Sequence, residues 1–333
     1  MSQLATELSA LVDDLVRGHA ATGAADERRT LWEQTRELGL HRVGIAEEQG
    51  GSGGALEDLA AIVGALGRNG VSLPVVETAT ADWVIAHGTG LTDRVATLFL
   101  SDHPLDTAAG TVTAELRGVP WARDSELLVV CAPGTAPLLV DLGHPSAEVR
   151  PGENLAGEPR DVVVLDGVPV TSSADGGPDT ERVRARLALL WSAAVTGAAH
   201  GAFRLTKTYV SERHQFGGPL LKIPAVAGNL ALMRVELLQA DAALSLALSG
   251  RPSPFAVESA RLVTATAATT VARIAHQLHG AMGITQEYPL HRFTRRLWAW
   301  RDAVASEREC AESLGHRAVA LGEEETWALL TPA

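Results

Sequence analysis

The chain has 333 residues, of which 46% are hydrophobic and 20% are charged, and its formal net charge is −12. The length predicts two to three domains, and the negative charge argues against nucleic-acid binding because it repels phosphate groups. No apolar run reaches the ~18 residues of a membrane span, the first residues lack the pattern of a signal peptide, and two cysteines, Cys131 and Cys310, are too few for a disulfide framework. We therefore expect a cytoplasmic protein that binds neither nucleic acid nor membrane.

Residues 1–95 predict an N-terminal helical domain. Leu4, Leu8 and Leu11 recur at intervals of three and four residues, as on one face of a helix. The glycine-rich segment 47–54 interrupts this pattern, which then resumes. That segment is typical of a loop between two helices.

Residues 96–178 predict a small antiparallel β domain. Short apolar segments are bounded there by Gly, Pro and Asp, which is typical of closely spaced strands. The expected strands cover residues 112–116, 127–132, 137–142 and 161–167.

Residues 179–333 predict a C-terminal bundle of four helices. One helix begins near Thr180, and further helical patterns cover 219–249, 253–279 and 294–320, joined by short Gly and Pro breaks. Long helices with short connections favour an antiparallel bundle. The chain as a whole is therefore expected to have an α+β multidomain fold.

Two glycine-containing segments of the bundle are the most informative part of the sequence. Arg213-His-Gln-Phe-Gly-Gly-Pro-Leu220 and Gln277-Leu-His-Gly-Ala-Met-Gly283 each follow a helical pattern. Their glycines let the main chain approach a large ligand closely, and the guanidinium of Arg213 can hold a phosphate through two parallel hydrogen bonds. Taken alone, an arginine followed by Gly-Gly-Pro is also a common helix stop.

Together and in this order, the two segments resemble the R-x-Q-F-G-x-P-[IL] and Q-x-x-G-G-x-G segments of the FAD-dependent acyl-CoA dehydrogenase family. The resemblance implies the same three-part fold, FAD as cofactor, an acyl-CoA thioester as substrate and an electron-transfer protein as acceptor. It also implies that FAD lies between the β domain and the bundle and reaches into a neighbouring subunit.

The resemblance further implies which residues contact FAD. They are Arg213, Gln215, Phe216, Gln277, Leu278, Gly280, Ala281 and Trp121. Ala281 replaces a family glycine, and Ala122 and Arg123 depart from the family's Trp-[Ile/Val]-[Ser/Thr] segment, which removes a hydroxyl donor. Trp121 also suits a plain core position of the β domain.

The family's flavin-binding loop and its catalytic base are not matched. Residues 98–110 replace the Thr-Glu-Pro-x-x-Gly-Ser loop, so the β domain looks trimmed. The usual position of the catalytic glutamate falls on Val304, and the alternative position on the first bundle helix falls on Leu187. Neither side chain can accept a proton. The nearest carboxylates, Asp302 and Glu307, reach the substrate only if the register shifts.

Some short family members that lack the base assemble with a full-length homologue into heterotetramers, often for bulky thioesters such as steroid side chains. This chain resembles them, with its Arg213 and Gln277 segments completing the FAD site of the partner. Two alternatives are a self-sufficient homomeric enzyme with a relocated carboxylate and a non-catalytic structural or regulatory protein. The sequence does not specify the acyl group. His276 and His279 share a helix but lack a third ligand, so we predict no metal site.

Overall fold

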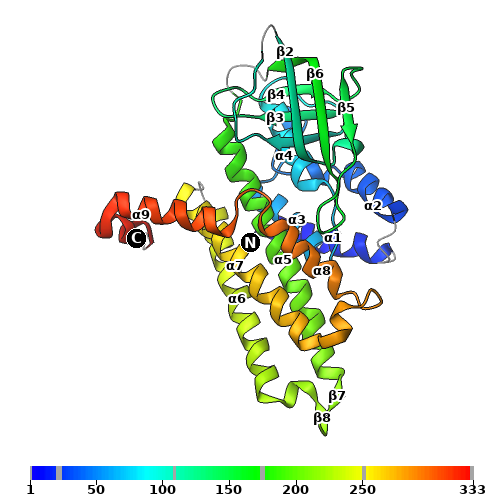
Figure 1. Cartoon of the computed structure of the whole chain (residues 1–333), viewed down its shortest axis with the longest axis vertical. Coiled ribbons are helices and arrows are strands. Elements are labelled where there is room, and N and C mark those ends of the chain that lie inside the picture. The colour runs from blue at the N-terminus through cyan, green and yellow to red at the C-terminus, as the bar shows by residue number, and fades with distance from the viewer. Residues whose placement is uncertain (1, 20–24, 108–109, 173–176, 250–252, 331–333) are drawn as a thin grey trace. The chain divides into compact units, whose positions relative to one another are not determined.

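The computed structural model describes residues 2–19, 25–107, 110–172, 177–249 and 253–330. The chain forms two compact units, Ser2–Val63 with Ser72–Leu187 and Gly64–Val71 with Ala188–Ala333. The first unit contains the β region and most of the N-terminal helices, and the second contains the helical bundle (Figure 1).

The N-terminal region is helical, as expected. Its longer helices are α1 (Gln3–Gly18), α2 (Ala25–Glu37), α3 (Leu56–Arg68) and α4 (Val75–His87). α1 begins after Ser2, whose hydroxyl oxygen accepts a hydrogen bond from the Ala5 amide at 2.9 Å and so caps the helix. α4 is buried along most of its length, and its buried residues include the carboxylates Glu77 and Asp82.

The β region forms one sheet in the order β1-β3-β4-β6-β2, with β5 paired to β6. The strands are β1 (Ala96–Leu100), β2 (Thr111–Pro120), β3 (Leu127–Cys131), β4 (Leu138–Asp141), β5 (Ala147–Arg150) and β6 (Arg160–Ser172). Alternate residues of these strands point to one face. Val119, Leu128, Val140 and Val163 lie there in a shared apolar core.

The expected small β domain is confirmed, with two differences in its strands. β1 runs parallel to β3, with Ala96 opposite Leu127, whereas the other pairs in this sheet are antiparallel. The sequence does not predict β5, because its Ala-Glu-Val-Arg pattern exposes Glu148 and Arg150 and carries little apolar signal. Charged side chains of this kind are common on edge strands.

Long helices make up the second unit. They are α5 (Thr180–Glu212), whose first turns belong to the first unit, α6 (Pro224–Leu248), α7 (Pro254–His279), α8 (Leu290–Arg301) and α9 (Glu307–Leu330). α7 packs against α6, α8 and α9, and Figure 1 shows α5, α6 and α7 running side by side. The expected helical bundle is thereby confirmed.

The helical run expected over 294–320 is two helices in the structure. α8 ends at Arg301, and α9 begins at Glu307 after a short loop. Side chains on both sides of the break cause it.

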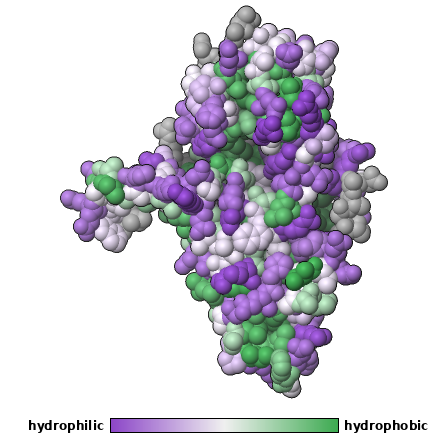
Figure 2. All heavy atoms as spheres, viewed as in Figure 1, coloured by the Kyte–Doolittle hydropathy of each residue, from purple (hydrophilic) through white to green (hydrophobic). Residues whose placement is uncertain are grey.

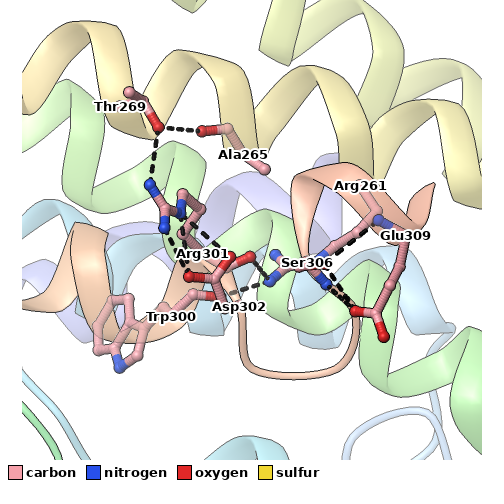
Figure 3. A network of polar contacts seen from close by, with 8 residues as sticks. All are labelled: Arg261, Ala265, Thr269, Trp300, Arg301, Asp302, Ser306 and Glu309. Carbon is pink, nitrogen blue, oxygen red and sulfur yellow. Dashed lines mark hydrogen bonds and ion pairs between the residues drawn. The ribbon is translucent and has the colours of Figure 1, made fainter. Parts of the chain in front are cut away.

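Arg261 of α7 closes the end of α8. Its buried guanidinium donates hydrogen bonds to the carbonyl oxygens of Trp300, at 2.6 Å, and Arg301, which a continuing helix would use itself. Ser306 then caps α9: its amide donates to the Glu309 carboxylate at 2.8 Å, and its hydroxyl accepts from the Glu309 amide at 3.2 Å (Figure 3). This is a capping box.

Candidate cofactor-binding site

α5 leads directly into a tight hairpin. β7 (His214–Gln215) pairs with β8 (Gly218–Pro219), and the two residues between them, Phe216 and Gly217, have φ values of 54° and 83°. Two consecutive positive φ values are typical of a type I′ turn. Positive φ is uncommon for a non-glycine residue, and Phe216 is 88% exposed. The hairpin therefore presents an aromatic ring to solvent at its tip.

The second segment surrounds the end of α7. Gly280 follows the helix with a φ of 57°, and a Cβ there would meet nothing within 4 Å. Its backbone is open to a ligand. Gly283 differs, because a Cβ there would lie 2.9 Å from the His279 Cβ and 3.1 Å from Leu290. Gly283 therefore allows close packing within the segment.

An aromatic cluster joins the two segments. Tyr209, one turn before Arg213, stacks on His279 with ring centroids 4.4 Å apart, and its hydroxyl donates to the His279 carbonyl oxygen at 3.4 Å. Tyr288 lies edge-on to Tyr209 at 5.6 Å and 5.0 Å from the His279 ring. Burial lowers the pKa of His279, so the stacked ring is neutral at neutral pH. The cluster fixes the Arg213 and Gln277 segments at one end of the bundle.

This end of the bundle is both polar and apolar at its surface. The side chains that lie exposed or half-buried there are those of Arg213, Gln215, Gln277, Leu278 and Ala281. The Arg213 amide donates to the Tyr209 carbonyl oxygen at 2.8 Å, and its own carbonyl oxygen accepts from the Leu220 amide at 2.9 Å. The backbone of Arg213 is therefore held while its side chain is exposed. Figure 2 shows apolar side chains gathered near the hairpin.

Trp121 lies in the first unit and is only 4% exposed. It follows β2 with a φ of 53°, and the guanidinium of Arg28 lies 5.6 Å from its ring centroid. Arg123, which the resemblance predicts to replace a family hydroxyl, is engaged by the buried Asp161: its Nε donates to the carboxylate at 2.8 Å. The hydrogen bonds to Asp161 raise the pKa of Arg123 further. These contacts hold the segment from Trp121 to Arg123 in place within the first unit.

Val304 lies in the loop between α8 and α9, half-buried. The two carboxylates that flank it are engaged by neighbours. Asp302 forms an ion pair with Arg301 at 2.7 Å (Figure 3), and the Glu307 carboxylate accepts a hydrogen bond from the Thr266 hydroxyl at 3.1 Å. Leu187 is 5% exposed in α5. The two positions at which the sequence predicts the base therefore hold apolar side chains.

The histidine pair of α7 has ordinary partners. His276 Nε2 lies 3.0 Å from the Thr294 hydroxyl, and His279 Nδ1 donates to the Ala275 carbonyl oxygen at 2.8 Å. Within the described residues, no three His, Cys, Asp or Glu side chains are grouped so as to hold a metal ion. The helices of that same part of the chain include none that is long and apolar enough to span a bilayer.

The chain thus combines a helical N-terminal region, a small β region and a helical bundle whose end exposes Arg213 and glycine-containing backbone. Two sequence models, described as the N-terminal and C-terminal domains of acyl-CoA dehydrogenase, match residues 2–90 and 184–301. The chain belongs to the acyl-CoA dehydrogenase family. The cofactor of this family is FAD, and its substrates are acyl-CoA thioesters.

Three similar proteins come from Mycobacterium tuberculosis. Acyl-CoA dehydrogenase FadE34 is 31% identical over 291 residues, which cover 82% of this chain but only 40% of FadE34. Acyl-CoA dehydrogenase IpdE2 is 28% identical over 329 residues, covering 95% of both chains. The crystal structure of the ChsE4-ChsE5 complex contains a chain that matches with a TM-score of 0.87 and 21% identity, over 97% of this chain and 99% of that chain. The structural likeness supports the fold.

Proposed function

We propose that this chain is a base-lacking subunit of a heteromeric, FAD-dependent acyl-CoA dehydrogenase. In this proposal it completes the FAD site of a homologous full-length subunit, which supplies the catalytic glutamate. The complex removes hydrogen from the α and β carbons of an acyl-CoA thioester and passes the electrons to an electron-transfer protein.

The proposal rests on two features together. The chain has the two segments that resemble the family's cofactor-binding segments, and it has no carboxylate at either position predicted for the catalytic base. Removing the α-proton of a thioester requires a carboxylate within hydrogen-bond reach. Val304 and Leu187 cannot accept that proton, and Asp302 and Glu307 are bound by Arg301 and Thr266. The Arg213 and Gln277 segments nevertheless form one ordered, exposed surface.

The residues of this surface fit FAD. The Arg213 guanidinium suits a pyrophosphate because it can donate two parallel hydrogen bonds. The open backbone at Gly280 allows close approach of the same group, and the Phe216 ring offers an apolar face to a neighbouring chain or to the adenine. FAD, when bound, supplies the two-electron acceptor, while this chain holds and orients it.

A partner subunit is also supported by the outer face of α6. Leu232, Val235 and Leu238 are 43%, 48% and 51% exposed, and Leu246 is 59% exposed. Their spacing puts them on one side of the helix. Exposed apolar surface of this kind marks a site of protein association. The ChsE4-ChsE5 structure, which has this fold, is described as a complex.

Flavin content tests the proposal. The chain is purified alone and after co-expression with a full-length homologue, and visible flavin absorbance is compared with protein absorbance. We expect little flavin in the isolated chain and stoichiometric flavin in the complex, because neither chain contains the whole site.

The other outcomes separate the alternatives. An isolated chain that is yellow, homomeric and active contradicts the proposal in favour of a self-sufficient enzyme. A complex that forms but stays colourless favours a structural or regulatory role.

A further inference from the structure

His279 has one ring nitrogen bound and the other buried without a partner. The residue ends α7 and is only 3% exposed. Its Nδ1 lies 2.8 Å from the Ala275 carbonyl oxygen, which can only accept a hydrogen bond, so Nδ1 carries the proton. Within the described ranges of the chain, Nε2 has no hydrogen-bond partner. The structure therefore selects the neutral ring with its proton on Nδ1.

A second proton on this ring is unfavourable while the ring stays buried. Protonation puts an N–H group on Nε2, which meets no acceptor among the described residues, and an unpaired buried donor costs free energy. Burial lowers the pKa of His279, its bond to the Ala275 carbonyl oxygen opposes this in part, and the nearby His276 lowers the pKa again. The protonated ring is therefore more stable outside its present position.

The titratable groups beside His279 come from three elements. Tyr209 of α5 and Tyr288, which precedes α8, have ring centroids 4.4 Å and 5.0 Å from the His279 ring, and His276 lies one turn earlier on α7. Burial, and then Tyr209 and Glu212, raise the pKa of Tyr288, so this phenol is neutral at neutral pH. Among the described residues, none of these neighbours is a carboxylate paired with His279. A positive charge on the ring would stay uncompensated.

His279 also links the two segments that resemble the family's cofactor-binding segments. Its carbonyl oxygen accepts a hydrogen bond from the Tyr209 hydroxyl at 3.4 Å, and its ring stacks on the same side chain. Tyr209 lies one turn before Arg213, whose amide donates to the Tyr209 carbonyl oxygen at 2.8 Å. Gly280, with its open backbone, directly follows His279. Displacing the ring therefore disturbs the support of both Arg213 and Gly280.

We propose that His279 is a positioning residue for FAD, and that protonation of its ring loosens the surface formed by the Arg213 and Gln277 segments. The neutral ring, stacked between the two tyrosines, keeps both segments in the arrangement that binds flavin. The protonated ring leaves this cluster, and the contact between the segments is lost. Flavin binding thereby weakens in acid, an inference that rests on the proposed function.

The direction of the pH dependence follows from the two positions of the ring. A histidine ring in water binds a proton near pH 6.5, whereas the ring in the cluster binds one only at lower pH. The cluster is therefore intact above about pH 6.5, and falling pH below that value favours the loosened form.

The two tyrosines of the chain test the loosening without any flavin. The sequence contains only two, and both contact His279, so tyrosine labelled with carbon-13 in its ring reports on this cluster alone. The NMR signals of the isolated full-length chain are followed from about pH 8 to about pH 5. We expect both signals to move together below about pH 6.5, while the helix content measured by circular dichroism stays constant.

Matched variants assign the transition to one ring. His279→Phe keeps an aromatic ring in the stack but binds no proton, so its tyrosine signals should stay constant over the same range. His276→Gln keeps a hydrogen-bonding group toward the Thr294 hydroxyl and should keep the transition. Tyrosine signals that do not move in the parent, that move equally in His279→Phe, or that stop moving only in His276→Gln each overturn the proposal.

Flavin affinity of the assembled complex tests the positioning role. We expect the Kd of the parent to be constant above about pH 6.5 and to rise below it, by at most about tenfold per pH unit for one proton. The Kd of His279→Phe should change much less over the same range. An equal change in parent and variant overturns the positioning role. If the complex binds no flavin at any pH, the proposed function fails, whereas the tyrosine signals still show whether His279 controls the surface.

Discussion

Arg213 is the residue on which the proposed cofactor contact depends most directly. Arg213→Lys keeps the charge but loses the two parallel donors, so flavin should be retained about tenfold more weakly by the assembled complex. Flavin release on dilution, followed by fluorescence, measures this. Arg234→Lys, at an exposed position of α6, is the control. Equal retention by the two variants would leave Arg213 only the role of a helix-end residue.

Glu77 shows how a single buried group shapes stability. Burial raises its pKa to about 7, and its ion pair with Arg160, at 3.3 Å, opposes that rise only in part. The folded state therefore binds a proton more tightly than the unfolded state does. Stability must fall as pH rises from about 4.5 to 7, by roughly 3 kcal/mol in total.

Glu77→Gln should remove this part of the pH dependence. Urea unfolding between pH 4.5 and 7.5 gives the slope of the unfolding free energy for the parent and the variant. Glu7→Gln, on the exposed surface of α1, should keep the parent slope. Identical slopes for Glu77→Gln and the parent would contradict a raised pKa at Glu77.

Among the helices, α3 and α5 approach each other through small residues. A Cβ on Gly197 of α5 would meet the Gly64 carbonyl oxygen well inside contact distance and lie 3.0 Å from the Arg68 amide nitrogen. Gly197→Ala should therefore cost about 1–3 kcal/mol of stability through overpacking. Gly228→Ala in α6, where a Cβ meets nothing within 4 Å, should instead gain about 0.5–1 kcal/mol. Urea unfolding measures the free energy of unfolding of both variants. A Gly197→Ala variant as stable as the Gly228→Ala variant would contradict the close approach of the two helices.

The helices and the main strands follow from sequence because their apolar spacing is local. The parallel pairing of β1 with β3 does not, since it joins segments that are separated by a third strand. The break between α8 and α9 depends on Arg261, a residue far away in the chain that takes up the last carbonyl oxygens of α8. The Ser306-x-x-Glu309 capping box was a local signal that could have indicated the new helix start.

The candidate cofactor-binding segments were also predictable as motifs, whereas the contact between them was not. The sequence shows the Arg213 and Gln277 segments at the ends of separate helical patterns, and only the fold brings Tyr209 onto His279. The contact residues themselves remain predictions, since their roles depend on a ligand. Trp121 illustrates the limit: its burial and its contact with Arg28 suit a core residue of the first unit.

The chain as a whole exposes apolar surface that an isolated subunit would leave in water. The outer face of α6 and the tip of the hairpin at Phe216 are two examples. Both lie on the same helical unit as the Arg213 segment. A subunit that shares a cofactor site across an interface needs such a surface beside that site, and association would cover it.

The proposed assembly with a partner subunit predicts that the catalytic base lies on the partner and not on this chain. If the partner supplies it, Asp302→Asn and Glu307→Gln in this chain should each leave turnover of the complex within a fewfold of the parent. Their carboxylates are engaged by Arg301 and Thr266, so these changes disturb only local contacts. Replacing the partner's own glutamate at the family position should instead lower turnover by roughly 10²–10⁴. A loss of about a hundredfold at Asp302 or Glu307, with flavin content intact, would assign the base to this chain and make it the self-sufficient enzyme.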